Sequence, residues 1–155
     1  MEPKIKQVPA IPVISRRDRL TTPQIPAHSG PAIHSLIDTL KRLGIEPAGN
    51  EIIYVYHGCT GDPAQPFDLQ ICLPVVAVSD VRPDVPVTFT TLAPFRCVAG
   101  KYVGSMTGIG PAWMKMCSFI REDGHKPTSE SREVYIKWVD FDSAENVTEL
   151  QQGIA

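Results

Sequence analysis

The sequence has little that would mark an exported, membrane-bound or nucleic-acid-binding protein. Apolar runs such as Leu73–Val78 stay far below the roughly 20 residues of a membrane-spanning helix. The first residues, MEPKIKQVPA, lack the apolar stretch of a secretory signal. The formal net charge is -2 and the pI is about 6.1, so no basic surface for nucleic acid is expected. We therefore expect a cytoplasmic protein with no membrane segment and no direct contact with nucleic acid.

Clustered metal ligands are missing as well. The four cysteines, Cys59, Cys72, Cys97 and Cys117, form no CxxC pair, and no histidine stands at metal-ligand spacing. These spacings predict no zinc site, redox motif or haem attachment, so we expect neither a metal nor a cofactor. The thiols of a cytoplasmic protein are expected to be reduced and mostly buried. The sequence also lacks a GxSxG turn, which leaves a serine hydrolase mechanism without support.

The chain is long enough for one packed domain. It has 155 residues, a mass of 17.0 kDa and 43% hydrophobic residues. A chain of this size buries roughly 70% of the surface that its unfolded form exposes. We therefore expect residues 1–155 to form a single domain with little disorder.

Fifteen prolines restrict where helices can lie, because proline breaks a helix interior. Two intervals are long enough, Pro31–Pro47 and Pro111–Pro127. Each starts with Gly-Pro-Ala, which suits a first helical turn, and each contains a glycine stop, Gly44 or Gly124. Apolar residues at helical spacing predict one buried stripe in each interval. The stripes are Ile33, Leu36, Ile37, Leu40 and Leu43, and then Trp113, Met116, Cys117 and Ile120.

The second interval repeats the first at a constant offset, which indicates an internal duplication. Runs typical of strands flank both helices. They are Ile11–Arg17, Ile52–His57 and Asp68–Leu73 in the first half, and Phe95–Val103, Glu133–Val139 and Glu149–Ile154 in the second. The run Val85–Leu92 falls outside the repeat and is expected to bridge the halves. The sequence predicts an α+β fold: duplicated β-α-β-β units, residues 3–80 and 85–155, form an antiparallel sheet with two helices and a central groove on a pseudo-twofold.

Longer runs of the sequence resemble a known family. SGPAIHSLIDTLKRLGIEPAG, YVYHG and FDLQICLPV are similar to the first half of the GyrI-like small-molecule-binding domain, and YVGSMTGIGPAWMKMCSFIREDGHKP, REVYIKW and TELQQGI to its second half. This family includes the effector-binding domains of AraC-type and MerR-type multidrug-sensing regulators. The resemblance implies a central pocket lined by aromatic residues around an acidic one, which accepts hydrophobic and often cationic compounds. The chain departs from the family pattern at Arg16–Thr22 and Gly104–Thr107. The segment that resembles the family begins within a few residues of Met1 and leaves no room before it for a helix-turn-helix domain, so the resemblance implies a stand-alone member.

Six residues are the candidates for ligand binding. Glu133 and Tyr135 share one face of a strand because side chains alternate, whereas Val134 and Ile136 are expected in the core. Tyr54 and Tyr56 are their equivalents in the first half and are expected across the groove. The resemblance implies that Trp113 reaches the pocket edge, although its place on the helix stripe also fits core packing. Tyr102, on the strand before the second helix, is a candidate pocket wall.

Other residues are ambiguous from sequence. Side-chain alternation along the strand places Trp138 on the same face as Val134, so it is expected in the core or at an exposed edge. Glu149 and Asp68 are repeat equivalents that are expected to be solvated.

Three function hypotheses remain. The leading one is a small-molecule-binding module whose ligand is hydrophobic or cationic. In the second, the catalytic residue is Glu133, which activates water to hydrolyse a reactive electrophilic compound in the same pocket. The third is interaction with a protein partner, with gyrase modulation as the precedent that the resemblance implies.

Overall fold

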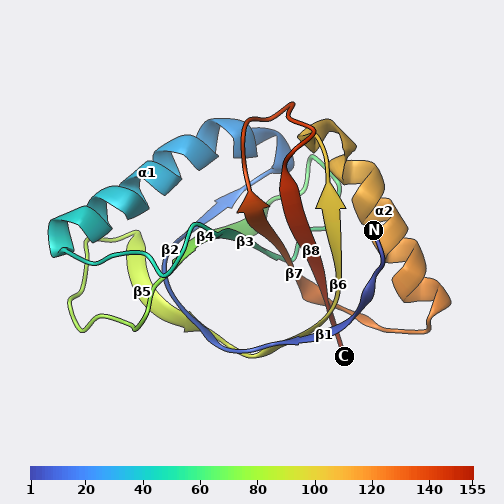
Figure 1. Cartoon of the computed structure of the whole chain (residues 1–155), viewed down its shortest axis with the longest axis horizontal. Coiled ribbons are helices and arrows are strands. Elements are labelled where there is room, and N and C mark those ends of the chain that lie inside the picture. The colour runs from blue at the N-terminus through green and yellow to red at the C-terminus, as the bar shows by residue number, and fades with distance from the viewer.

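The computed structural model describes all 155 residues as one sheet with two helices on the same side of it (Figure 1). Short 3-10 turns, Thr22–Gln24 and Met106–Gly108, lead into the helices. The elements are β1 (Lys4–Val8), β2 (Ile11–Leu20), α1 (Ile25–Leu43), β3 (Ile52–His57), β4 (Phe67–Pro74), β5 (Val87–Leu92), β6 (Phe95–Val103), α2 (Ile109–Glu122), β7 (Pro127–Lys137) and β8 (Val147–Ile154).

The sheet is antiparallel and its strand order is β1-β6-β8-β7-β3-β4-β2-β5. Reading outward from the β3–β7 pair, β3-β4-β2 on one side matches β7-β8-β6 on the other. The predicted duplication is therefore confirmed, and the pseudo-twofold runs between β3 and β7. Tyr54 of β3 lies directly opposite Glu133 of β7 at this central pair.

The run around Val85–Leu92 is not outside the repeat, which corrects the sequence prediction. β5 pairs with β2 of the other half, and β1, which the sequence analysis missed, pairs with β6 in the same way. Both pairings follow one register, from Lys4 opposite Ala99 to Arg16 opposite Val87. Together β1–β2 and β5–β6 form a single two-stranded ribbon, called the ribbon below. Figure 1 shows it curving beneath the central strands from one end of the sheet to the other.

Both helices begin before the predicted proline. α1 starts at Ile25 and keeps Pro31 in its interior, while α2 starts at Ile109 and holds Pro111 within its first turn. Pro26 stands in the first turn of α1, where a missing N–H removes no helical bond, so this earlier start is favourable. The glycine stops are confirmed, because Gly44 and Gly124 have φ of 67° and 72°. Neither helix is both long and apolar enough to cross a membrane.

The core lies in layers on the two faces of the sheet. The stripe of α1 packs Leu36 and Leu40 on β2, β3 and β4, and that of α2 packs Met116 and Ile120 on β6 and β8. A third layer, including Val13, Val55 and Val134, lies on the opposite face, toward the ribbon.

Several core predictions were wrong. Cys117 and Ile37 are exposed because the buried stripe runs through Ala112 and Ala32, one residue away from the apolar positions chosen. Ile136 is 36% exposed near the end of β7, where little packs over it. Of the cysteines, Cys72 and Cys97 are buried, while Cys59 lies exposed after β3.

Candidate functional site

A buried carboxylate lies at the centre of the sheet, on the face that carries the helices. Glu133 is 5% exposed. Its Oε1 accepts hydrogen bonds from the hydroxyls of Tyr56 at 2.6 Å and Tyr135 at 2.7 Å. Its Oε2 accepts one from Nε1 of Trp113 at 2.7 Å. Three aromatic donors from β3, β7 and α2 therefore converge on one acid.

The rings around Glu133 also contact one another. Tyr54 and Tyr135 meet edge to face with ring centroids 4.8 Å apart, and Tyr135 meets Trp138 in the same way at 5.8 Å. Tyr56 lies 5.7 Å from the ring of Phe67 on β4. Such contacts stabilise aromatic pairs by about 0.5–1.5 kcal/mol beyond their burial. The rings thus form two groups, which Glu133 joins through its hydrogen bonds with Tyr56 and Tyr135. They are called the aromatic wall below.

The phenols of this wall stay protonated. Burial raises the pKa of Tyr56 and of Tyr135 well above the usual value, and the negative charge of Glu133 raises both further. Burial also raises the pKa of Tyr54, although the nearby Ser29 hydroxyl lowers it. A protonated phenol donates its hydrogen, so these values preserve the hydrogen bonds to Glu133.

Glu133 has no basic partner. No Lys, Arg or His nitrogen lies within 4.0 Å of its oxygens, whereas Glu149 and Asp68 each form ion pairs. All three donors to Glu133 are neutral side chains. The site therefore combines a buried acid with apolar and aromatic surroundings and no built-in countercharge. No three His, Cys, Asp or Glu side chains come together as metal ligands.

The structure brings five of the six candidate residues together. Glu133 with Tyr135, Tyr56 and Trp113 form the hydrogen-bonded group, and Tyr54 joins through its ring contact with Tyr135. Tyr102 does not join, because its hydroxyl donates to the backbone oxygen of Ser105 at 2.7 Å and its ring packs under α2.

Trp138 and Phe67 belong to the site but were not among the candidates. The pairing of β7 with β8 shifts register between Tyr135 and Lys137, so simple alternation fails there. This places the Trp138 ring on the Tyr135 side. Phe67 was missed because the predicted strand began at Asp68, one residue later than β4 does. The contact of Phe67 with Tyr56 also depends on the β3–β4 register, which local sequence does not give.

Glu149 and Asp68 are less exposed than expected. Glu149 is 7% exposed and its Oε1 accepts from Nζ of Lys6 at 2.8 Å. Hydrogen bonds from Lys6 and Gln151 outweigh the effect of burial and lower the pKa of Glu149. Asp68 pairs with Arg17 and Arg19 on β2, and the Arg17 hydrogen bond lowers its pKa. Neither carboxylate contacts Glu133.

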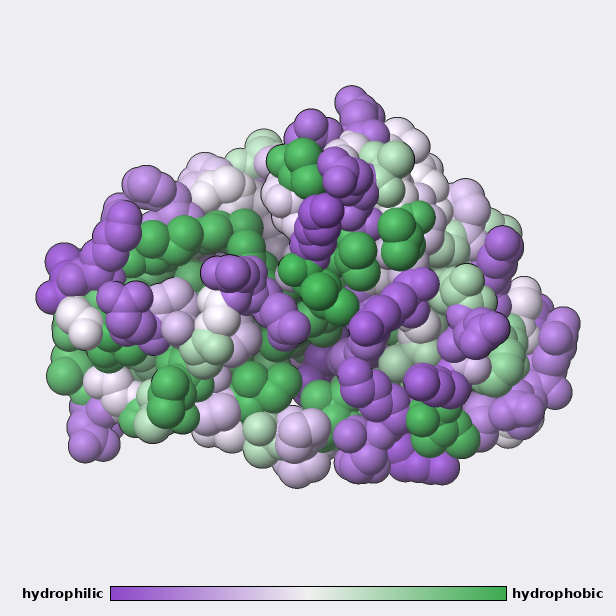
Figure 2. Space-filling view, viewed as in Figure 1, coloured by the Kyte–Doolittle hydropathy of each residue, from purple (hydrophilic) through white to green (hydrophobic).

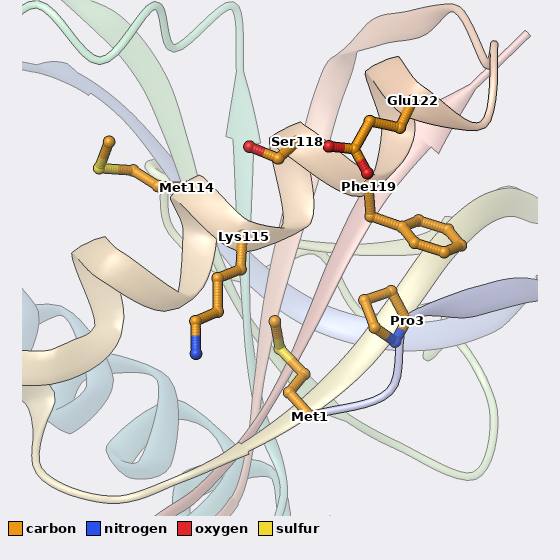
Figure 3. Close-up of a pocket in the computed structure, with 7 residues that line it drawn as sticks. All are labelled: Met1, Pro3, Met114, Lys115, Ser118, Phe119 and Glu122. Atoms are coloured by element: carbon orange, nitrogen blue, oxygen red, sulfur yellow. The ribbon is translucent and has the colours of Figure 1, made fainter.

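Five surface hollows are lined by residues other than Glu133. One, of about 350 Å³, lies between the first residues and α2, where Pro3 lies beside Phe119 and Met1 also lines the hollow (Figure 3). On the face viewed in Figure 2, hydrophobic side chains come to the surface along α1 and between the helices, beside hydrophilic ones. Exposed hydrophobic residues next to the site include Trp138, at 51%.

Solved structures share this fold. The chain superposes on EcmrR in its complex with DNA with a TM-score of 0.81 at 19% identity, covering 99% of this chain and 57% of EcmrR. It matches the EcmrR C-terminal domain with a TM-score of 0.76 at 17% identity, covering 99% and 97%. SAV2435, bound to tetraphenylphosphonium, has a TM-score of 0.63 at 12% identity, covering 100% and 94%. No curated protein sequence matches the chain.

A duplicated sheet-and-helix fold around an enclosed acid and its aromatic partners defines a small-molecule-binding domain. The family model described as the GyrI-like small molecule binding domain matches residues 1–151. The chain belongs to this family. The expected family is thus confirmed, and the chain spans 57% of the EcmrR chain that binds DNA.

Proposed function

We propose that the Glu133 site binds a hydrophobic organic cation. The observation that carries this proposal is a carboxylate, 5% exposed, that accepts three hydrogen bonds from neutral aromatic side chains and pairs with no base. A buried carboxylate without a countercharge is costly, and a bound cation offsets that cost. The ligand supplies the positive charge that the protein omits.

The aromatic wall suits the rest of such a ligand. Faces of Tyr and Trp rings attract a cation within about 6 Å of their centres, and they bury flat apolar groups at the same time. Trp138 is half exposed and contacts Tyr135, so it lies where a ligand would first meet the site. Because Glu133 is enclosed in this conformation, binding requires these rings to move.

The experiment compares a cation with a neutral molecule of similar shape. Tetraphenylphosphonium, the compound bound to SAV2435, and neutral triphenylphosphine oxide are titrated into the protein by calorimetry. We expect the cation to bind more tightly. Glu133→Gln keeps the shape of the side chain and removes its charge, so the affinity for the cation should fall at least about tenfold while that for the oxide changes little.

Glu46→Gln is the matched control, because it removes one negative charge at an exposed position after α1. Its affinity for tetraphenylphosphonium should equal that of the unchanged protein. Equal affinity of the Glu133→Gln variant for the cation would contradict the proposed role of this carboxylate.

The hydrolytic alternative is less well supported by the geometry. A carboxylate has about four lone-pair positions, and three of those on Glu133 already accept hydrogen bonds. A general base needs a free position directed at water, and the one that is left, on Oε2, belongs to a side chain that is 5% exposed. A hydrolase from Listeria innocua shares the fold, with a TM-score of 0.68 at 13% identity and coverage of 99% and 92%. Mass spectrometry of a bound electrophile over time tests this role, since unaltered compound counts against it.

A further inference from the structure

A second polar group lies on the opposite face of the sheet, toward the ribbon. Arg132 precedes Glu133 on β7, and its side chain is 3% exposed. Its Nε and Nη2 both donate to Oε2 of Glu130, at 3.0 and 2.9 Å, and its guanidinium lies 4.0 Å from the centre of the Phe95 ring. These contacts fix the side chain, yet its Nη1 is buried without an acceptor.

Gln151, directly opposite Arg132 on β8, has a buried acceptor without a donor. Gln151 is 3% exposed, and its Nε2 donates to Oε1 of Glu149 at 2.7 Å. Lys6 holds the same Glu149 oxygen at 2.8 Å. This chain of bonds orients the Gln151 amide, whose Oε1 is buried without a donor. One free donor and one free acceptor therefore stand on adjacent strands.

Both residues line one cavity of about 230 Å³ between the central strands and the ribbon. Val8, Ile53 and Val134 form an apolar part of its wall, and Lys6 and Lys101 lie on the polar side. A cavity of about 150 Å³ can hold benzene, so this one has room for a molecule of roughly ten heavy atoms.

Leaving a buried donor or acceptor unpaired costs about 1–3 kcal/mol each, so a partner for both atoms stabilises the site. We propose that this cavity is a second ligand site, which binds a small aliphatic carboxylate with a hydroxyl on the neighbouring carbon. The carboxylate accepts from Nη1 of Arg132, the hydroxyl donates to Oε1 of Gln151, and the aliphatic chain packs on the apolar wall. Both atoms are shielded in this conformation, so binding includes a rearrangement of side chains in the cavity wall.

The charges of the lining favour an anion. Lys6 and Arg132 form ion pairs with Glu149 and Glu130, and Lys101 lies opposite Glu149 on β6, where its charge also acts on that carboxylate. The side chains that line the cavity include three positive residues, Lys6, Lys101 and Arg132, and two negative ones, Glu51 and Glu149. Glu51 also lines the cavity but is exposed, where water and salt screen its repulsion.

The test uses the hydroxy-acid analogue of leucine, leucate, with two matched probes. Isocaproate lacks the hydroxyl, and the amide of leucate lacks the charge. Calorimetric titration of the whole protein should give at least about tenfold tighter binding for leucate than for either probe. Isocaproate leaves Oε1 of Gln151 unpaired, and the amide replaces the charge-assisted hydrogen bond with Arg132 by a weaker bond to a neutral carbonyl. Absence of leucate binding at about 10 mM, a concentration corresponding to very weak affinity, would overturn the proposal.

Two variants locate the binding. Gln151→Met removes Oε1, so it should bind leucate and isocaproate equally. Arg132→Lys removes Nη1 but keeps the charge and should weaken both about tenfold. Arg96→Lys, at an exposed guanidinium that contacts Ala155, is the control and should bind leucate as the unchanged protein does.

Thermal unfolding checks that each variant is folded. If Arg132→Lys does not fold, the comparison of leucate with isocaproate in Gln151→Met tests the proposal by itself. Leucate binding that survives Arg132→Lys but is lost in Glu133→Gln would assign the ligand to the central site and overturn the proposal.

Discussion

At the scale of single residues, the two oxygens of Glu133 are held differently. Oε1 has two donors, whereas Oε2 depends on the indole of Trp113 alone. Losing a phenol therefore leaves Oε1 with one remaining bond, but losing the indole leaves Oε2 with none. A hydrogen bond to a charged group contributes about 1.5–3 kcal/mol, so this asymmetry is measurable.

Trp113→Phe should lower the free energy of unfolding by about 1.5–3 kcal/mol, because it keeps an aromatic ring and removes the only donor to Oε2. Denaturant unfolding measures the change. Tyr102→Phe is the comparison, since it removes a hydrogen bond from a neutral phenol to the backbone oxygen of Ser105 and should cost about 1 kcal/mol. Equal losses in the two variants would contradict the special dependence of Oε2 on Trp113.

The raised pKa values of the tyrosines predict a loss of stability at high pH. The folded pKa values of Tyr56 and Tyr135 exceed the value of about 10 for an unfolded chain, so the unfolded state loses these protons first. The contribution to stability is complete below pH of about 10 and disappears as pH rises toward the folded values. Denaturant unfolding across this range should show a decline that Tyr56→Phe and Tyr135→Phe each reduce. A decline of the same size in both variants would assign it to other groups.

The candidate residues show what sequence can predict at this scale. Strand alternation correctly placed Glu133 and Tyr135 on one face, since that depends on a single strand. The convergence of Tyr56 and Trp113 on the same carboxylate depends on the β3–β7 register and on the position of α2, neither of which follows from local sequence. The resemblance, not periodicity, suggested Trp113. Trp138 was misplaced because a register shift in β7 interrupts the alternation.

At the scale of elements, α1 tolerates a proline where a helix normally does not. Pro31 lies seven residues into the helix, where its missing N–H removes a bond to the preceding turn. The exposed side of the helix carries this defect, since Pro31 is exposed and Ala32 is buried. Proline therefore was a sound guide to the number of helices but a poor one to their first residues.

Pro31→Ala should stabilise the protein by about 1–3 kcal/mol, because alanine restores the helical bond and is the better helix former. Thermal unfolding should show a rise of roughly 2–4 °C for each kcal/mol at this chain length. Pro26→Ala, in the first turn, restores no helical bond and should give no gain. An equal rise in both variants would show that proline itself, rather than its place in the helix, determines the effect.

At the scale of the whole molecule, the ribbon joins the two halves by pairing each with the other. β1 covers the edge of β6, and β5 covers the edge of β2. The repeat and the α+β architecture could be predicted from sequence, because they depend on local patterns. The ribbon could not, because β1 is short and mostly exposed, and its pairing with β6 joins distant parts of the chain.

Deletion of residues 1–8 should expose the edge of β6 to pairing with another molecule. We expect the shortened protein to be less stable and to form dimers or larger species in size-exclusion chromatography. Ile5→Lys changes an exposed side chain on β1 and keeps the backbone pairing, so this variant should elute as the full chain does. Unchanged elution of the deletion variant would contradict the protective role of β1.

The ribbon also bears on how the chain is made. The first strands leave the ribosome early, but they cannot pair until their partners have been synthesised: Lys4 pairs with Ala99, and Ile11 with Leu92. Contacts so distant along the chain form slowly, because closing a long loop costs entropy before it is repaid. Nascent chains that carry only the first half have β3, β4 and β2 but neither partner for the ribbon, so the finished domain closes only after most of it has been translated.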